Sequence, residues 1–338
     1  MARPNRPPRI VTLCCHGRTA LPKDNAERIA LVPQITRLLY ERPDWHPIDA
    51  VVFPGGFFRM SRPFGPSSFA QRRSAVSSEQ FAKAIRVMVG ILDGLSPGVR
   101  VVTGVLATPR DLTERTEQSS LAFSASTLVS VSRKIFPTAQ DTRGKRYITP
   151  FVADYSSAHR FLDLANGSVA LLSACYDLFG VGDIATDTAA RRLAIRRLYL
   201  GRRPITHGEE AFIEARHNCL AAWTELVHEK RPDVALATIH GFRQAGQDGY
   251  WQRHGIARAS AALGGALVAA GAHFQNGLPY PTSSTLASWN VPRVHLARGL
   301  TRKAHRLEPT VYLVSETTGP KILLRLFTRP RTSDTGGQ

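Results

Sequence analysis

The sequence predicts a single α/β domain, and three observations support this fold class. Short apolar runs typical of buried strands alternate along the chain with segments that repeat apolar residues at helical spacing. Of the 338 residues, 43% are hydrophobic and 21% are charged, which are ordinary values for a globular protein. No linker composition and no solenoid repeat divides the chain. We therefore expect one domain over residues 10–328, between a basic disordered N-terminus at 1–9 and a disordered C-terminal tail at 329–338.

The predicted strands are runs of Val, Ile, Leu, Ala and Phe bounded by residues that favour turns. In chain order they lie at residues 10–14, 49–53, 99–106, 121–125, 128–131, 169–172, 233–239, 266–270, 294–297, 311–314 and 322–327. Two pairs of these runs are close enough to form hairpins. The first joins 121–125 to 128–131, and the second joins the last two runs across Thr318-Gly319-Pro320.

The predicted helices lie between these runs. Asp24 and Asn25 can cap a helix that includes Ile29 and Ile35, although Pro33 should kink or restart it. Residues 59–76, rich in Arg, Ser, Pro and Phe, are predicted to be a loop. A helix follows Ser77, because apolar residues recur there at spacings of four and three, at Phe81, Ile85, Met88, Leu92 and Leu95. A third helix, rich in small residues, is expected at about 250–263.

The net positive charge of the chain suggests nucleic acid as one class of partner. The chain has 44 basic and 26 acidic residues, a formal net charge of +18, which attracts polyanions. The best candidate for such binding is a predicted helix over 191–203 that has no acidic residue. It carries six arginines, Arg191, Arg192, Arg196, Arg197, Arg202 and Arg203. A solvated helix face explains the same run, so both interpretations stay open.

Several other classes of protein are disfavoured. No segment approaches the roughly 18 consecutive apolar residues of a membrane span, and no apolar core of a secretory signal precedes Ile10. We therefore expect a cytoplasmic protein without membrane contact. The four cysteines form no C-x-x-C pair. His240, His254 and His273 lack the short spacing of zinc ligands, so we expect neither a metal nor a cofactor.

Cys175 is the strongest candidate for chemistry. It follows a buried apolar run, in the segment 169–177 (V-A-L-L-S-A-C-Y-D), where a predicted strand passes into a turn. A cysteine there can be exposed at the edge of a sheet, while the next backbone N–H, that of Tyr176, is free to bind an oxyanion. A buried structural cysteine is the competing interpretation, because cysteine is among the most buried residue types.

Three motifs in the chain resemble those of the carbon–nitrogen hydrolase (nitrilase) superfamily. The segment 172–179 (L-S-A-C-Y-D-L-F) resembles its nucleophile motif, and 131–136 (V-S-R-K-I-F) resembles the motif that carries its lysine. Residues 49–54 (D-A-V-V-F-P) resemble the first motif, D-L-V-V-F-P-E. The run at 101–105 resembles the family's strand between the first and second motifs. The motifs occur in the family's order, and the resemblance covers roughly residues 10–300.

This resemblance implies a four-layer α-β-β-α sandwich of the nitrilase type and, from the family's usual subunit pairing, a homo-oligomer. It implies that Cys175 attacks the carbon of a small amide or nitrile. Lys134 and the backbone N–H of Tyr176 then hold the developing negative charge. A looser alignment adds Asp154 as an acidic residue of the site. The family's pocket-bordering loop and helix fall on a segment that contains His240, Tyr250, Trp251 and His254.

One position departs from the family's pattern. Where the first motif ends in glutamate, this chain has Gly55. The resemblance implies that the carboxylate takes the thiol proton and later returns a proton to the departing amine, and glycine can do neither. Gly55→Glu would restore this carboxylate, and we expect the variant to fold with little effect on stability only if the pocket is open and Lys134 points into it.

Pro54-Gly55-Gly56 also resembles an early loop of the class I glutamine amidotransferases, but Cys175 lacks their G-x-C-x-G surroundings. Three hypotheses about function follow. The first is a thiol-dependent hydrolase of amides or nitriles whose base comes from another segment. The second is a nitrilase-like binding or regulatory subunit without that activity. The third is a nucleic-acid-associated protein that uses the arginine helix.

Overall fold

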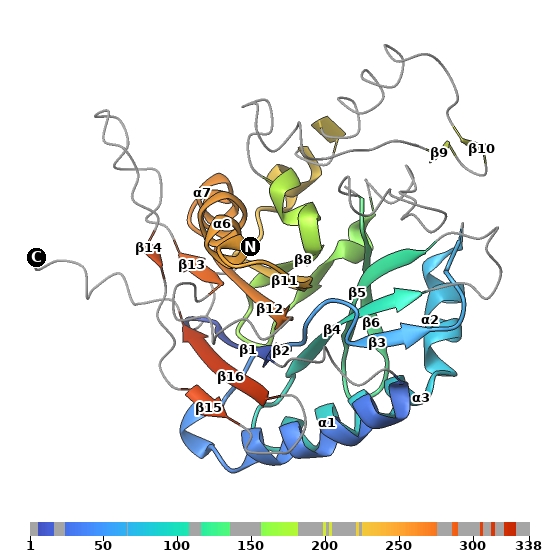
Figure 1. Cartoon of the computed structure of the whole chain (residues 1–338), viewed down its shortest axis with the longest axis vertical. Helices are drawn as coiled ribbons and strands as arrows, with labels where there is room; N and C mark the ends of the chain where they lie inside the picture. Colours follow the sequence, from blue (N-terminus) through green and yellow to red (C-terminus); the bar gives the residue numbers. More distant parts are fainter. Residues whose placement is uncertain are drawn as a thin grey trace, which may run out of the picture.

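The computed structural model describes a large part of the chain as one α/β fold (Figure 1). The described residues are 6–16, 24–65, 67–107, 116–135, 157–181, 225–275, 286–289 and 321–328, with short pieces at 199–200, 203–204, 221–222, 305–306 and 312–314. No helix within these ranges is both long and apolar enough to cross a membrane.

The main described strands form one continuous sheet with two halves. The first half runs in the order β6 (Leu128–Arg133), β5 (Glu117–Phe123), β4 (Arg100–Ala107), β2 (Ala50–Val52) and β1 (Arg9–His16). At its margins lie β3 (Phe58–Met60), β16 (Lys321–Thr328) and β15 (Tyr312–Val314). The second half runs β12 (Leu267–Phe274), β11 (Val234–Phe242), β8 (Val169–Ala174) and β7 (Phe161–Asp163), with β13 (Ala287–Trp289) and β14 (His305–Arg306) beside β12. The halves join where the end of β1 pairs in parallel with the end of β12.

The two halves of the sheet pack face to face. The hydroxyl of Ser120 on β5 lies 2.6 Å from the hydroxyl of Thr238 on β11 and donates to the carbonyl of Ser173 on β8 at 3.2 Å. Around these contacts the inner faces bury small and branched apolar side chains from both halves, including Val52, Val102, Ala170, Leu172, Val234 and Leu236. The sheet therefore forms the two inner layers of a sandwich.

Helices cover the two outer faces. Helices α1 (Asn25–Tyr40) and α3 (Gln80–Asp93) pack on the first half of the sheet, whereas α6 (Gln247–Trp251) and α7 (Ala257–Ala262) lie on the other side of the fold (Figure 1). Each helical layer encloses its own apolar cluster against the strands. The predicted fold class, an α/β fold with the layers α-β-β-α, is confirmed.

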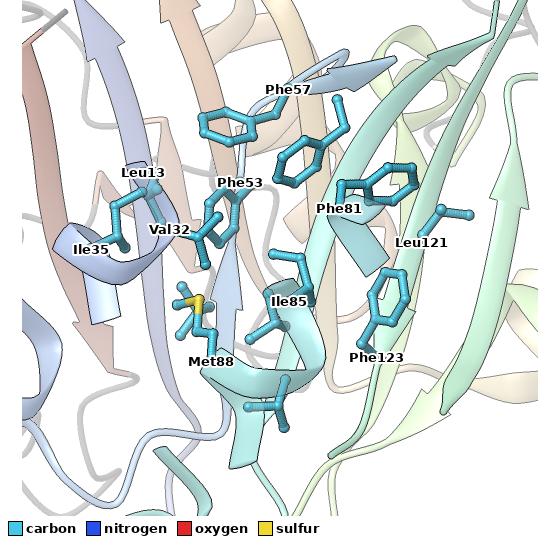
Figure 2. Packing of buried hydrophobic residues seen from close by; sticks show 14 of the residues in the cluster. Leu13, Val32, Ile35, Phe53, Phe57, Phe81, Ile85, Met88, Leu121 and Phe123 are labelled. Atoms are coloured by element: carbon cyan, nitrogen blue, oxygen red, sulfur yellow. The ribbon is translucent and has the colours of Figure 1, made fainter. Parts of the chain in front are cut away.

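The helices of the first outer layer form as their sequence patterns predict. Asp24 caps α1 by accepting a hydrogen bond from the backbone N–H of Glu27 at 2.9 Å. The helix continues through Pro33 without restarting. In α3 the apolar repeat faces the sheet, and Figure 2 shows Phe81, Ile85 and Met88 among the side chains of α1 and the strands. Each such side chain contributes about 1.5–3 kcal/mol when fully buried.

Several local predictions are corrected. Residues 59–76 are not one loop, because β3 extends to Met60 and α2 (Phe69–Ser77) follows its N-cap residue, Ser68. Ser68 and Gln71 form a capping box, whose S-x-x-Q spacing was the available signal.

The predicted helix over 191–203 is wrong at its C-terminal end. Here β9 (Tyr199–Leu200) pairs antiparallel with β10 (Arg203–Pro204), so that Arg203 lies opposite Leu200. Gly201 and Pro204 disfavour a helix at this point. The preceding arginines of this run, and Arg202, lie outside the described residues.

Residues 6–9 are ordered, although we expected them to belong to a disordered N-terminus. Arg6 forms two hydrogen bonds with the carboxylate of Asp49, at 2.7 and 2.8 Å, and the backbone N–H of Arg9 donates to the same carboxylate. The Asp49 side chain is fully buried, so it requires these donors. The expected C-terminal tail at 329–338 lies outside the described residues.

Candidate functional site

Four candidate positions meet at one edge of the sandwich. Strands β2, β1, β12, β11 and β8 run parallel to one another, and β6 has the same direction because two antiparallel pairings separate it from β4. Gly55, Lys134 and Cys175 follow the carboxyl ends of β2, β6 and β8, and His240 lies near the end of β11. In open parallel sheets this edge is where ligands bind.

Cys175 occupies a strained position at the end of β8. It begins a 3-10 helix (Cys175–Gly180) with a φ of 55°, in the left-handed region that residues with side chains rarely adopt. Such a conformation costs about 1–2 kcal/mol. The side chain is nearly buried, with 8% of its surface exposed. This sharp turn from strand to helix is the type of turn on which hydrolases present a nucleophile.

A buried polar network holds the segment after β6 against this turn. The carboxylate of Asp177 accepts a hydrogen bond from the backbone N–H of Ile135 at 2.8 Å. The guanidinium of Arg160 lies 3.9 Å from the same carboxylate and donates to the carbonyl of Arg133 at 2.9 Å. Both charged side chains are almost completely buried. Because the network spans Arg133 to Ile135, it fixes Lys134 beside the helix that begins at Cys175.

Lys134 is a buried lysine, with 3% of its surface exposed. Its Nζ donates to Oε1 of Gln118 at 2.9 Å and lies 5.8 Å from the centre of the Tyr176 ring. A positive charge held in a poorly hydrated place stabilises negative charge that develops nearby more strongly than a solvated one does. The geometry is therefore suited to an oxyanion next to the Cys175 turn.

Aromatic side chains line the helical side of the same turn. The Tyr176 ring stacks on Phe179 with centroids 4.7 Å apart, and Trp251 packs edge-on against both rings. Tyr250 stacks at 6.0 Å on Phe179, and its ring centroid lies 4.6 Å from that of His254. A single π-helical turn (Gln252–Ile256) separates α6 from α7 here, an irregularity that is frequent at functional sites. The structure thus brings three of the four predicted pocket-bordering residues to the Cys175 segment.

The fourth, His240, occupies the space beside Gly55. A Cβ atom on Gly55 would lie 2.7 Å from Nδ1 of His240 and 2.8 Å from both the His240 backbone nitrogen and the Thr238 carbonyl oxygen. The Gly55 N–H donates to the carbonyl of Ile239 at 3.0 Å, which keeps the two backbones close. Position 55 therefore requires glycine because the backbone and side chain of β11 come so close to it. Its neighbour Gly56 requires glycine for a different reason, its positive φ of 62°. The pocket is not open at Gly55, so the condition under which Gly55→Glu would be accommodated is not met.

Two titratable groups near Gly55 have lowered pKa values, His273 and Arg28. Burial, together with the nearby charges of His240 and Arg28, lowers the pKa of His273 to about 3. Burial also lowers the pKa of Arg28 to about 10, which leaves it charged at neutral pH, and its guanidinium donates to the carbonyls of Gly56 and Phe57. The loop after β2 is therefore bound by Arg28 of α1 and by the backbone of β11.

Two predictions fall outside what the structure describes. Asp154 lies outside the described residues, as do Arg191, Arg192, Arg196, Arg197 and Arg202 of the arginine run. Within the described ranges, no group of three or more His, Cys, Asp or Glu side chains could hold a metal ion.

No protein-family model and no curated protein matches the chain. Several solved structures of an amidase match it. The NitN amidase from Nesterenkonia sp. AN1 matches with 12% identity and a TM-score of 0.48, over 97% of this chain and 94% of that one. A mutant of this organism's amidase, with the acetamide moiety of fluoroacetamide covalently added at the active site cysteine, matches with 13% identity and a TM-score of 0.47, over 97% and 93%. A further mutant, described as from the nitrilase superfamily, matches with 14% identity and a TM-score of 0.44, over 96% and 92%.

Sequence reasoning missed the residues that support the site. Asp177 was part of the C-Y-D motif, but its link to Ile135 and Arg160 joins segments more than 15 residues apart and has no local signature. The placement of His240 had a weak signal, the two glycine-containing pairs Gly55-Gly56 and His240-Gly241, each at the end of an apolar run.

Proposed function

We propose that this protein is a thiol-dependent hydrolase of a non-peptide C–N bond, in a small amide or nitrile, with Cys175 as its nucleophile. The observation that carries the proposal is the strained turn at Cys175, φ 55°, with a buried lysine fixed beside it. Strain of this kind persists only where the surrounding structure maintains it, and it is concentrated at functional sites. The resemblance of the three motifs to the nitrilase superfamily supports the same chemistry.

In this reaction Cys175 attacks the carbonyl or nitrile carbon, and negative charge develops on the oxygen or nitrogen. Lys134 and the backbone N–H of Tyr176 stabilise that charge, because both are fixed before the substrate arrives. Removing one such donor typically lowers kcat by about 10²–10³-fold. Cys175 and Lys134 are both more than nine-tenths buried, which favours a small substrate over a polypeptide.

One observation favours the alternative, a nitrilase-like subunit that binds without hydrolysis. Gly55 replaces the carboxylate on which the family's proton transfers depend, and the loss of a positioned general base costs about 10²–10⁴-fold in rate. The two functions make different predictions for the reactivity of Cys175, since a nucleophile needs a lowered thiol pKa whereas a buried structural cysteine is inert.

The test measures alkylation by iodoacetamide at pH 7, with each cysteine followed by peptide mass spectrometry, and ammonia release from acetamide and propionamide. We expect Cys175 to react faster than a free thiol, and faster than the buried Cys14 and Cys15. Cys175→Ala should abolish ammonia release, and Lys134→Met should reduce it by at least ten-fold.

Lys83→Met is the matched control, because Lys83 is an exposed lysine on α3, in the outer helical layer. It should leave both measurements unchanged. If Cys175 alkylates no faster than Cys14 and no ammonia is released, the hydrolase proposal is wrong and the binding function is favoured.

A further inference from the structure

Strand β11 carries an irregularity at His240. Along β11 and β12 the residues pair one to one as far as Ile239 with Ala272, but the next pair is Phe242 with Phe274. His240 and Gly241 of β11 therefore lie opposite a single residue of β12, His273. An extra residue of this kind is a β-bulge, which re-aims a side chain and is over-represented next to active sites.

Two glycines make room for the imidazole that this bulge re-aims, and a third, Gly241, allows the backbone of the bulge to pass close to β12. Gly241 has a φ of 140°, which only glycine adopts readily, and a Cβ there would lie 3.0 Å from the His273 side chain. On the facing loop, a Cβ on Gly55 would lie 2.7 Å from Nδ1 of His240, and one on Gly56 would lie 2.6 Å from Nε2. Any side chain at either position would displace the ring. The imidazole is thus packed directly against the position at which the motif resemblance expects a carboxylate.

The register also places His240 close to the strand end that Cys175 follows. Ala174, the last residue of β8, pairs with Thr238 of β11, so β11 is two residues short of His240 at the level where β8 ends and the turn at Cys175 begins. Neighbouring strands lie about 4.8 Å apart. His240 therefore lies near the level at which the nucleophile turn begins, on a strand that the nucleophile's own strand contacts.

We propose that His240 is the general base and acid of this site, in place of the carboxylate that Gly55 lacks. The inference rests on the proposed hydrolase function and names the group that its proton transfers require. Imidazole is suited to this task because its ordinary pKa is about 6.5, so it both accepts and donates protons near neutral pH.

Hydrolysis of an amide proceeds through a thioester on Cys175. His240 takes the proton of the Cys175 thiol while Sγ forms a bond to the carbonyl carbon, and the carbonyl π electrons move to oxygen. When the tetrahedral intermediate collapses, the C–N bond breaks and the departing amine takes the proton from the imidazolium. Water then attacks the thioester, His240 accepts its proton, and the C–S bond breaks. The proton returns to sulfur, and the products are a carboxylic acid and an amine.

Among the described residues, the titratable and charged groups near His240 come from β12, from α1 and from the end of β8. His273 on β12 interacts electrostatically with His240 and stays neutral because burial lowers its pKa to about 3. Arg28 on α1 remains charged and binds the loop that carries Gly56. Cys175 lies at the end of β8. Because a Cys175 thiolate would favour an imidazolium, the pH profile reports on the pair of Cys175 and His240.

The experiment records Cys175 alkylation by iodoacetamide, and ammonia release from acetamide, between pH 5 and pH 9. Its variants are His240→Gln and His240→Glu. We expect His240→Gln to lower kcat for ammonia release by about 10²–10⁴-fold. It should also move the midpoint of the alkylation profile towards the free-thiol value of about 8.5. His240→Glu retains a proton acceptor, so it should keep part of the activity and move the acid limb towards pH 4–5.

His159→Gln is the matched control, because the His159 side chain is exposed and stacks on Phe69 of α2. It should change neither profile. Circular dichroism establishes that each variant is folded, and if His240→Gln is not, the comparison of the wild-type and His240→Glu profiles decides.

The outcomes separate the two proposals. Rapid alkylation and ammonia release in the wild type, with unchanged profiles in His240→Gln and His240→Glu, would overturn the role of His240 and leave Cys175 as the nucleophile. Slow alkylation without ammonia release in the wild type would overturn both. A lowered rate with the shifted acid limb in His240→Glu supports His240 as the base, since a residue with a purely structural role would not move that limb.

Discussion

Gly55→Ala should destabilise the fold by about 2 kcal/mol. The new methyl group would lie 2.7 Å from Nδ1 of His240 and 2.8 Å from two backbone atoms of β11, all closer than carbon atoms tolerate. Overpacking of this kind costs about 1–3 kcal/mol. Relief of the clash by separating the backbones weakens the 3.0 Å hydrogen bond from Gly55 to Ile239, worth about 0.5–1.5 kcal/mol. The lower entropy of the unfolded alanine chain offsets about 0.4–1 kcal/mol.

Urea unfolding followed by circular dichroism measures this change in the free energy of unfolding. Gly90→Ala is the matched control, because Gly90 lies in α3 with no atom within 4 Å of the added methyl group. Alanine is the better helix former there, so this variant should gain up to about 1 kcal/mol. A Gly55→Ala protein as stable as the wild type would refute the reasoning, since it would mean that the imidazole is not held against Gly55. Gly55→Glu, with a longer and charged side chain, should be less stable still.

Three further predictions concern the same edge of the sheet. At Cys175, where φ is 55°, the glycine variant should be at least as stable as the alanine variant in urea unfolding, whereas at an ordinary position it is less stable by about 0.5–1 kcal/mol. Asp177→Ala should lower the free energy of unfolding by about 3–5 kcal/mol, because it leaves the buried Arg160 uncompensated. Asp177→Asn should cost less, since an amide oxygen can still accept from Ile135. Because the folded-state pKa of His273 is about 3, below its unfolded value of about 6.5, its contribution to stability is present above pH 6.5 and is lost as the pH falls towards 3. The slope is about 1.4 kcal/mol per pH unit, and urea unfolding of His273→Gln between pH 7 and pH 4 should lack it.

Local sequence patterns were sufficient to predict most elements of the fold. The run at 10–14 became β1, the repeat after Ser77 became α3, and the two expected hairpins are present as β5 with β6 and β15 with β16. These patterns are reliable because burial on one face imposes a period of two or 3.6 residues. Helix α2 was missed because its composition is polar and its only signal is the capping box at Ser68. The two-stranded piece at 199–204 was missed because its arginines suit either structure.

The sequence by itself determined which residues are the candidates for chemistry at this site. Cys175, Lys134 and the glycine at position 55 follow from motifs whose order and local spacing are written in the chain. Only the tertiary structure decided which side chain lies beside Gly55, where the motif resemblance expects a carboxylate. His240 reaches Gly55 through a bulge in β11 and the pairing of β11 with its neighbours, and Asp177 fixes Lys134 through a contact between two strand ends. These contacts join residues 42 to 185 positions apart in the chain, and no local pattern records them, because side chains so distant in sequence meet only when the sheet has assembled.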